Sequence, residues 1–296
     1  MVVLPGLVFA DSLFTLIPVL CVLAFVLYII NLVTKVEGNE GYSFTVFPWV
    51  NTFPETLTSV VTAIHGYTTA SIWNSVFSAT FDLMILGVSG IRSGYVRFAV
   101  RDLVYPTVVG GFLTAILLLD GSLNLYDGFM LYIVLLAVSI IAIARYGFRV
   151  VATKQNIVRH VLGLVGIAVV AYIYSLYVMA LCEFVSERIA GIVSAVLTSL
   201  PDVVTAVVYG LETPEAQSEL LGCIMHDFNE NLATTAIVAG LFGRELVDAN
   251  PLLTVITVAF TMIFLVATLA DGDIDTYDGL LLVGVFGILA TLAILL

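Results

Sequence analysis

Two short segments combine a proline with an acidic residue inside long apolar runs. Residues 51–59 read NTFPETLTS, and residues 198–206 read TSLPDVVTA. In both segments the acidic residue, Glu55 or Asp202, directly follows the proline. A carboxylate at membrane depth costs at least ~2.5–3.5 kcal/mol, so such residues face one another or a water-filled cavity. The pattern therefore indicates a pair of functional acids.

The prolines add oxygen ligands of a second kind. A proline inside a helix removes one backbone hydrogen bond and crowds the carbonyl group one turn earlier. Pro54 and Pro201 should therefore free carbonyl oxygens near Asn51 and Thr198, one turn before each acid. Carboxylates, carbonyls and hydroxyls together form an all-oxygen cage, which suits hard cations such as sodium and calcium.

A second apolar segment follows each proline segment and carries a polar pair. Ser78 and Asp82 are four residues apart in the first half of the chain, and Asp227 and Asn231 are four apart in the second. Residues at this spacing share one face of a helix. Each half therefore offers a polar pair that points in one direction. Broken helices that meet at the membrane midplane are typical of secondary transporters.

The composition indicates that these segments lie in a membrane. The chain is 61% hydrophobic and only 11% charged, with a mean hydropathy of +1.13, outside the range of soluble domains. Its apolar runs approach the ~20 residues that a spanning helix needs. Ten such helices are predicted at 12–34, 42–64, 72–90, 100–119, 128–144, 161–182, 189–210, 218–241, 251–270 and 279–296.

The basic residues predict orientation and organisation. Eight of the ten fall in connections after odd-numbered helices, and only Arg188 and Arg244 fall on the other side. Basic connections stay in the cytoplasm, so both termini should be extracellular and the protein should lie in the cell membrane. The most basic connection, 145–160, separates five helices in 1–144 from five in 161–296. We therefore predict an all-α membrane protein with ten transmembrane helices in two inverted five-helix repeats.

These motifs resemble those of the calcium:cation antiporter superfamily, which includes the sodium/calcium exchangers. Its two repeats read roughly G-[ST]-S-x-P-[ED] in one helix and G-N-x-x-G-S-N-x-x-[ND] in the next. The first element is matched by Thr198, Ser199, Pro201 and Asp202, and more loosely by Asn51, Thr52, Pro54 and Glu55.

The second element is matched in part. Ser78 and Asp82 occupy the serine and the final position in the first half, and Asn231 holds the final position in the second. Asp227 stands where the exchangers usually have a hydroxyl, and neither half contains the GSN triplet. The resemblance therefore rests on two segments of about 40 residues and on the five-plus-five arrangement.

The resemblance implies a secondary active antiporter that exchanges sodium for calcium by alternating access. The central calcium would lie between Glu55 and Asp202, with carbonyl groups of Asn51 and Thr198 assisting. The flanking sodium sites would use Thr52, Ser199, Ser78, Asp82, Asp227 and Asn231. Transported Na+ and Ca2+ are thus the expected ligands, and no resident cofactor is expected.

Other functions remain open. A proton-coupled antiporter for calcium or another cation would use the same oxygen ligands, and a channel would use a similar path. An intramembrane aspartyl protease also needs two carboxylates, but its GxGD signature is absent, so we expect no enzyme. The expected partners are the lipid bilayer and small cations, without nucleic acid, and we expect a monomer. His226 and Glu230, four residues apart, are interpreted as a local structural pair, with a proton relay as the alternative.

Overall fold

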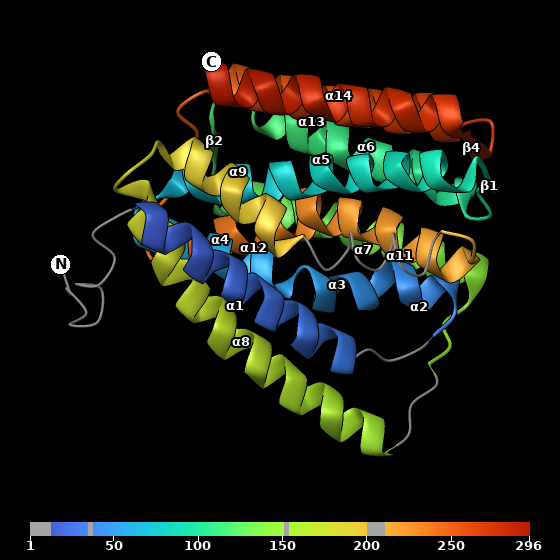
Figure 1. Cartoon of the computed structure of the whole chain (residues 1–296), viewed down its shortest axis with the longest axis horizontal. Helices are drawn as coiled ribbons and strands as arrows, with labels where there is room; N and C mark the ends of the chain where they lie inside the picture. The colour runs from blue at the N-terminus through green and yellow to red at the C-terminus, as the bar shows by residue number, and fades with distance from the viewer. Residues whose placement is uncertain (1–12, 35–37, 151–153, 200–210) are drawn as a thin grey trace.

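The computed structural model describes residues 13–34, 38–150, 154–199 and 211–296, and these ranges are almost entirely helical (Figure 1). Asp202 and Pro201 lie outside the described residues. The helices are α1 (Leu13–Thr34), α2 (Glu40–Thr45), α3 (Phe47–Asn51), α4 (Phe53–Ile64), α5 (Thr68–Ser93), η2 (Arg101–Leu103), α6 (Val104–Leu117), α7 (Leu125–Tyr146), α8 (Lys154–Cys182), α9 (Glu187–Thr198), α11 (Pro214–Met225), η3 (His226–Asn231), α12 (Leu232–Leu241), α13 (Pro251–Leu269) and α14 (Thr276–Leu295).

The helix predicted at 42–64 is divided into α2, α3 and α4. Pro48 lies in the first turn of α3 and Pro54 in the first turn of α4, where a missing backbone N–H is tolerated. Thr52 is the residue between α3 and α4. The break places Glu55 in the first turn of α4, where the positive end of the helix dipole favours an anion.

The helix predicted at 218–241 is also interrupted, in this case by a π-helix. The six residues of η3 form a π-helix between α11 and α12, and all six are buried. A π-helix accommodates extra residues in a wider turn and is frequent at functional sites. Asp227 and Asn231 both lie in this segment.

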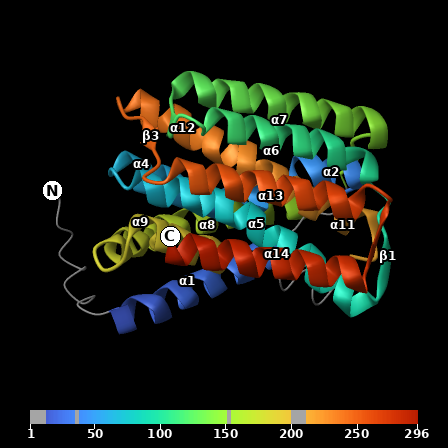
Figure 2. The same ribbon diagram turned by 90° about the horizontal axis from the view of Figure 1, so that it is seen from above.

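The helix α5 lies at the centre of the bundle. It packs against α4, α9, α13 and α14. In its apolar 18-residue stretch 83% is buried, compared with 28% in the corresponding stretches of α7 and α14. The helices α1 and α8 pack against each other, and in Figure 2 α1 lies at one edge of the bundle and α7 at the opposite edge. The residues Ser78 and Asp82 of α5 are therefore positioned in the interior.

Two short antiparallel strand pairs join the halves of the chain at opposite ends of the bundle (Figures 1 and 2). One pair consists of β1 (Tyr95–Arg97) and β4 (Asp273–Asp275), with Val96 opposite Ile274. The other consists of β2 (Ser122–Leu123) and β3 (Leu246–Val247). Each pair links a connection in the first half to one in the second.

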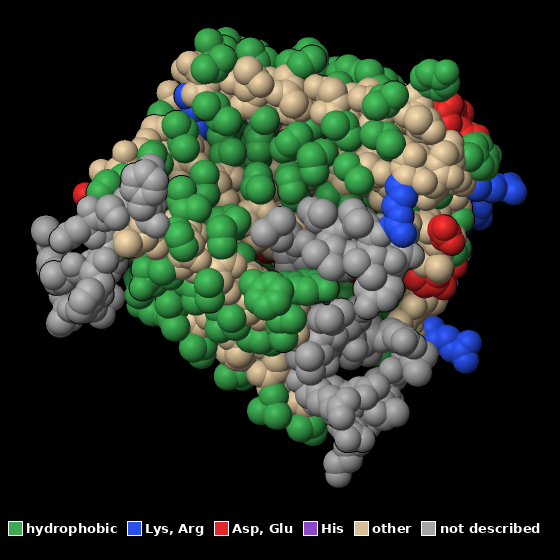
Figure 3. All heavy atoms as spheres, in the orientation of Figure 1, with side chains coloured by type: hydrophobic (Ala, Val, Ile, Leu, Met, Phe, Trp, Pro, Cys, Tyr) green, Lys and Arg blue, Asp and Glu red, His purple; other side chains and the backbone are tan. Residues whose placement is uncertain are grey.

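The outer surface suits a lipid environment. Hydrophobic side chains dominate the visible face, and most of its charged side chains gather at the end that carries β1 and β4 (Figure 3). Within the described ranges, five helices are long and apolar enough to cross a membrane: α5, Val161–Cys182 of α8, α7, α13 and α14. A shorter apolar helix covers Thr15–Ile30. The chain is therefore a multi-pass helical membrane protein.

The observed bounds depart from the predicted ones mainly at α8. This helix begins at Lys154, inside the predicted connection 145–160. Its first residues, KQNIVRH, are polar but include good helix formers, so the helix extends beyond its apolar part. An apolar run predicts the part of a helix that lies in lipid, and the helix itself can begin several residues earlier.

Candidate cation-binding site

Glu55 lies beside the C-terminal end of α9. Its side chain is only 2% exposed, and its carboxylate lies within hydrogen-bonding reach of the hydroxyl groups of Thr198 and Ser199. Thr198 is the last residue of α9, and Ser199 caps that helix. The structure therefore brings together three candidate ligands from the two halves of the chain.

Several buried polar atoms on α4, α5 and η3 have no hydrogen-bond partner among the described residues. They are Oε2 of Glu55, Oγ of Ser78 and both polar atoms of the Asn231 amide, from side chains at most 2% exposed. Leaving such an atom unpaired costs roughly 1–3 kcal/mol, so buried polar groups normally have a partner, ordered water included. All three residues were predicted ligands. Their unpaired oxygens fit a site that holds a hydrated or directly coordinated cation.

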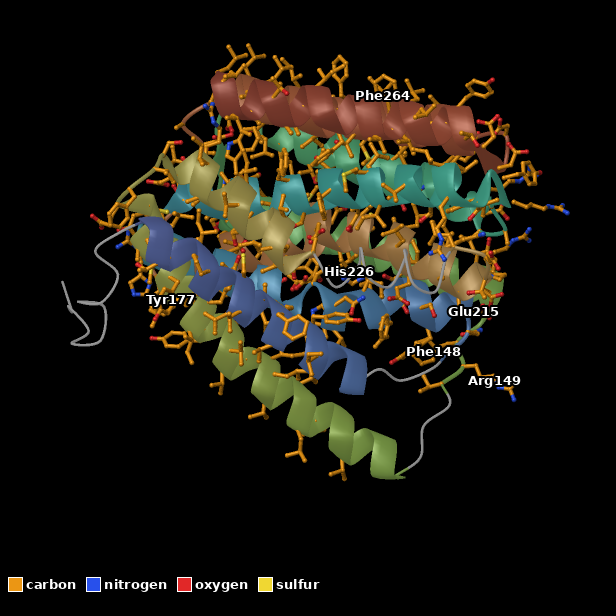
Figure 4. All side chains as sticks on the ribbon, in the orientation of Figure 1. Phe148, Arg149, Tyr177, Glu215, His226 and Phe264 are labelled. Carbon is orange, nitrogen blue, oxygen red and sulfur yellow. The ribbon has the colours of Figure 1, made fainter. Side chains whose placement is uncertain are left out.

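The remaining acids of the predicted site are also buried. Asp82 is 1% exposed on α5, and Asp227 is 2% exposed on η3. The elements α4, α5, α9 and η3, which carry the predicted ligands, pack in contact as α4–α5, α4–α9, α4–η3, α5–α9 and α5–η3. Figure 4 shows His226, the first residue of η3, in the interior about midway between the ends of the bundle.

Carboxylates alone do not complete a metal site within the described part of the chain. No three His, Cys, Asp or Glu side chains there are grouped closely enough to hold a metal ion. A cation beside Glu55 would therefore need hydroxyl, amide and carbonyl oxygens, or Asp202. Coordination by Glu55 and Asp202 together stays a prediction.

Three predicted ligands are oriented by hydrogen bonds of their own. The hydroxyl of Thr52 donates to the carbonyl of Pro48 at 3.0 Å, and that of Thr198 lies 2.9 Å from the carbonyl of Ser194. Hydroxyls in apolar helices commonly bond back to the preceding turn, which leaves oxygen lone pairs available to a cation. Asn51 instead donates its amide to Oε1 of Glu219 at 3.1 Å.

Asn74 of α5 holds the backbone of the site. Its amide nitrogen donates to the carbonyl of Glu55 at 3.1 Å and to the hydroxyl of Ser59 at 3.0 Å. The side chain is 1% exposed. It therefore fixes the first turn of α4 against α5.

The predicted pair of His226 and Glu230 is wrong. Glu230, 2% exposed, accepts hydrogen bonds from the indole of Trp49 at 3.2 Å and from the hydroxyls of Thr56 at 3.1 Å and Thr234 at 2.9 Å. The four-residue spacing suggested His226 as the partner of Glu230, but two of its partners come from α3 and α4. Thr234 also lies four residues from Glu230, and this spacing could have predicted the third partner.

Known structures share this architecture. No protein-family profile matches the sequence, and no curated protein matches it. The fold is shared with the solved structures of two membrane ion exchangers.

Two exchangers illustrate the likeness. The sodium-calcium exchanger NCX_Mj, soaked with Na+ and Sr2+, has a TM-score of 0.67 at 18% identity, over 94% of this chain and 95% of that one. The H+/Ca2+ exchanger CAX has a TM-score of 0.71 at 13% identity, over 97% of this chain and 86% of that one. At such identities the likeness establishes the fold, and the resemblance seen in the sequence is confirmed at that level.

Proposed function

We propose that the protein belongs to the calcium:cation antiporter superfamily and exchanges sodium for calcium across the cell membrane. The observation that carries the proposal is the set of buried, unpartnered polar atoms of Glu55, Ser78 and Asn231, in a fold shared with two kinds of calcium exchanger. Calcium requires oxygen ligands, and this site offers them from both halves of the chain.

The packing supports ten spans in two inverted repeats. The contact of α5 with α9 has a counterpart in the contacts of α11 and α12 with α2 and α4. The contact of α5 with α14 likewise has a counterpart between α12 and α7, and the two strand pairs correspond as well. Exchanging the halves 1–144 and 161–296 thus reproduces the contact pattern, as a two-fold relation between repeats requires.

In the proposed mechanism, calcium lies between Glu55 and Asp202, with carbonyls of Asn51 and Thr198 as further ligands. Sodium ions occupy flanking positions near Thr52, Ser199, Ser78, Asp82, Asp227 and Asn231. Because the calcium and sodium positions are adjacent in one buried site, the two ions compete for its negative charge, and this competition couples their opposite movements.

A proton-coupled exchanger is the second candidate. The H+/Ca2+ exchanger has a TM-score at least as high as that of the sodium-calcium exchanger, and buried carboxylates can carry protons as well as cations. The likeness in fold does not favour either coupling ion, so the driving gradient distinguishes the two functions.

Flux measurements test the proposal. Purified protein in vesicles loaded with sodium should accumulate calcium against its gradient when the outside is sodium-free. Matched vesicles loaded with potassium, or with an imposed pH gradient, test the other coupling ions. If only the pH gradient drove calcium accumulation, the coupling ion would be the proton instead of sodium. If calcium only moved down its own gradient, the protein would be a channel.

We propose that both termini are extracellular. The final residue, Leu296, lies at the end opposite β1 and β4 (Figure 1), and α1 also starts at that end. Arg97, Arg101 and Arg145 line a cavity of about 350 Å³ at the β1–β4 end, which fits a cytoplasmic side. Labelling of single cysteines at Tyr95 and Tyr126 in intact cells should reach only the latter.

A further inference from the structure

The buried carboxylate of Glu230 lies outside the predicted ligand set and has a full set of donors. Oε1 accepts from the Trp49 indole at 3.2 Å and the Thr234 hydroxyl at 2.9 Å, and Oε2 accepts from Thr56 at 3.1 Å. Tyr132 of α7 in turn contacts the Thr234 hydroxyl at 2.5 Å. One carboxylate therefore connects α3, α4 and η3, and the chain of hydroxyls extends the connection through α12 to α7.

Two of these donors lie on opposite sides of the break in the proline helix. Trp49 belongs to α3, and Thr56 belongs to α4, while Thr52 separates the two helices. The backbone through this break is interrupted by Pro54, so helical hydrogen bonds alone do not fix the relative orientation of α3 and α4. Glu230 bonds to both pieces from the facing helix.

The connection reaches the candidate ligands directly. Thr56 follows Glu55 in sequence, and its hydroxyl also lies 3.0 Å from the carbonyl of Thr52. A low-dielectric interior strengthens these hydrogen bonds. A shift of Glu230 would therefore move the turn that carries Glu55.

We propose that Glu230 is a positioning residue: its carboxylate clamps α3 and α4 to the π-helix η3 and thereby sets where Glu55 and Thr52 stand at the cation site. The inference rests on the proposed function for its transport readout. It assigns no cation ligand to Glu230, because the three donors already occupy its oxygens.

Two substitutions separate shape from charge. In Glu230→Gln, the amide oxygen can still accept from Trp49 and Thr234. The amide nitrogen can donate to the Thr56 hydroxyl, which then donates its own hydrogen bond to the Thr52 carbonyl. Glu230→Leu keeps similar bulk and loses every bond. We expect Glu230→Leu to raise the KM for calcium about tenfold with a smaller change in kcat, and Glu230→Gln to stay within about twofold of the native protein.

Further variants separate the clamp from general destabilisation. Thr56→Val removes a single bond at constant shape and should raise the KM by less than Glu230→Leu. Thr261→Val is the matched control, since it removes a buried hydrogen bond between α5 and α13, Thr80 to Thr261 at 3.1 Å, away from the clamp. We expect Thr261→Val to leave the KM for calcium unchanged.

Tryptophan fluorescence tests the clamp without transport. The chain has two tryptophans, Trp49 and Trp73, so a Trp73→Phe background leaves Trp49 as the only emitter. Loss of the indole bond in Glu230→Leu should shift the Trp49 emission maximum, whereas Glu230→Gln should keep it. A native protein without exchange would overturn the proposed function, and the emission comparison would still decide on the clamp.

Two results would overturn the positioning role. If Glu230→Gln impaired calcium transport as severely as Glu230→Leu while Trp49 emission stayed native, Glu230 would act through its charge. If Glu230→Leu left both the emission maximum and the KM unchanged, the hydrogen bonds would not hold the site.

Discussion

The third helix of each proposed repeat carries the same polar spacing on a different backbone geometry. In the first half, α5 is a continuous α-helix of 26 residues, whereas residues 214–241 are interrupted by the π-helix η3. Thr80 of α5 meets Thr261 of α13 at 3.1 Å, and Asn229 of η3 meets Thr114 of α6 at 3.0 Å. Corresponding positions thus contact corresponding helices, despite the interruption.

The next position along each helix shows the sharpest difference. Phe81 packs edge-on against Phe286 of α14, with ring centroids 5.5 Å apart. Its counterpart, Glu230, is held by hydrogen bonds. One repeat therefore fixes its helix by the shape of aromatic rings, and the other fixes it by a directional polar network. The proposed repeats therefore hold corresponding helices in place by different kinds of contact.

The largest expected effect is at Glu55. Glu55→Gln keeps the shape of the side chain and removes the charge that offsets calcium dehydration. We expect loss of calcium exchange by at least about a hundredfold. The same loss is expected for Asp202→Asn, measured as calcium uptake into sodium-loaded vesicles. Normal uptake by Glu55→Gln would remove Glu55 from the central site.

Truncating the aromatic contact should affect stability more than affinity. Phe81→Ala leaves a cavity beside Phe286 and should cost about 3–5 kcal/mol of folding free energy. We expect a clear fall in the thermal unfolding temperature, with a smaller rise in calcium KM than Glu230→Leu produces. The opposite ranking would mean that the aromatic contact, rather than the polar network, positions the ligands.

Ser78 should discriminate between the two ions. Ser78→Ala removes one neutral oxygen that has no partner among the described residues. Sodium dependence should weaken several-fold, roughly one ligand's contribution, while divalent binding stays largely intact. Sodium titrations at fixed calcium measure the first quantity and calcium binding without sodium the second. Abolished calcium binding in this variant would reverse our assignment of the two sites.

A smaller effect is expected at the joint between α5 and α13. Thr261→Val removes the hydrogen bond to Thr80 at nearly constant volume. Hydrogen bonds between membrane helices average about 0.6 kcal/mol, so the unfolding temperature should fall only slightly. A large fall would show that this half also depends on polar contacts.

The smallest effect concerns the connections outside the bundle. Tyr67 donates a hydrogen bond to Glu183 at 2.9 Å, and burial together with this carboxylate raises the pKa of Tyr67 to about 12. The folded state therefore favours the neutral phenol. Its stabilisation is complete below the ordinary pKa, about 10, and is lost as the pH rises through 12.

Unfolding temperatures at pH 9 and pH 11.5 would measure this loss. The native protein should lose slightly more stability than Tyr67→Phe over this interval, because only the native side chain titrates. Equal losses would show that the contact between these two connections is energetically neutral.

Apolar runs predicted where the helices lie because burial in lipid demands length and composition. They could not predict the separate helices α2 and α3, since Pro48 acts only through local geometry. The π-helix was also missed, because its extra residue is specified by packing around Asn229 rather than by periodicity. Glu230 was misassigned for the same reason: its partners, Trp49 and Thr56, are more than 170 residues away in sequence.

The site residues fared differently. The structure places Glu55 near Thr198 and Ser199, as the proposed central site requires, and cation binding by these residues stays a prediction. The shared coordination of one ion by Glu55 and Asp202 stays a prediction, since Asp202 lies outside the described residues.

The central place of α5 has a consequence for biosynthesis. It is the least apolar of the five long spans and the most buried, yet α14, one of its main partners, follows it by almost two hundred residues. A ribosome adding about 5–20 residues per second would need roughly ten seconds or more to supply that partner. The packing around α5 is therefore completed only after α14 has been synthesised.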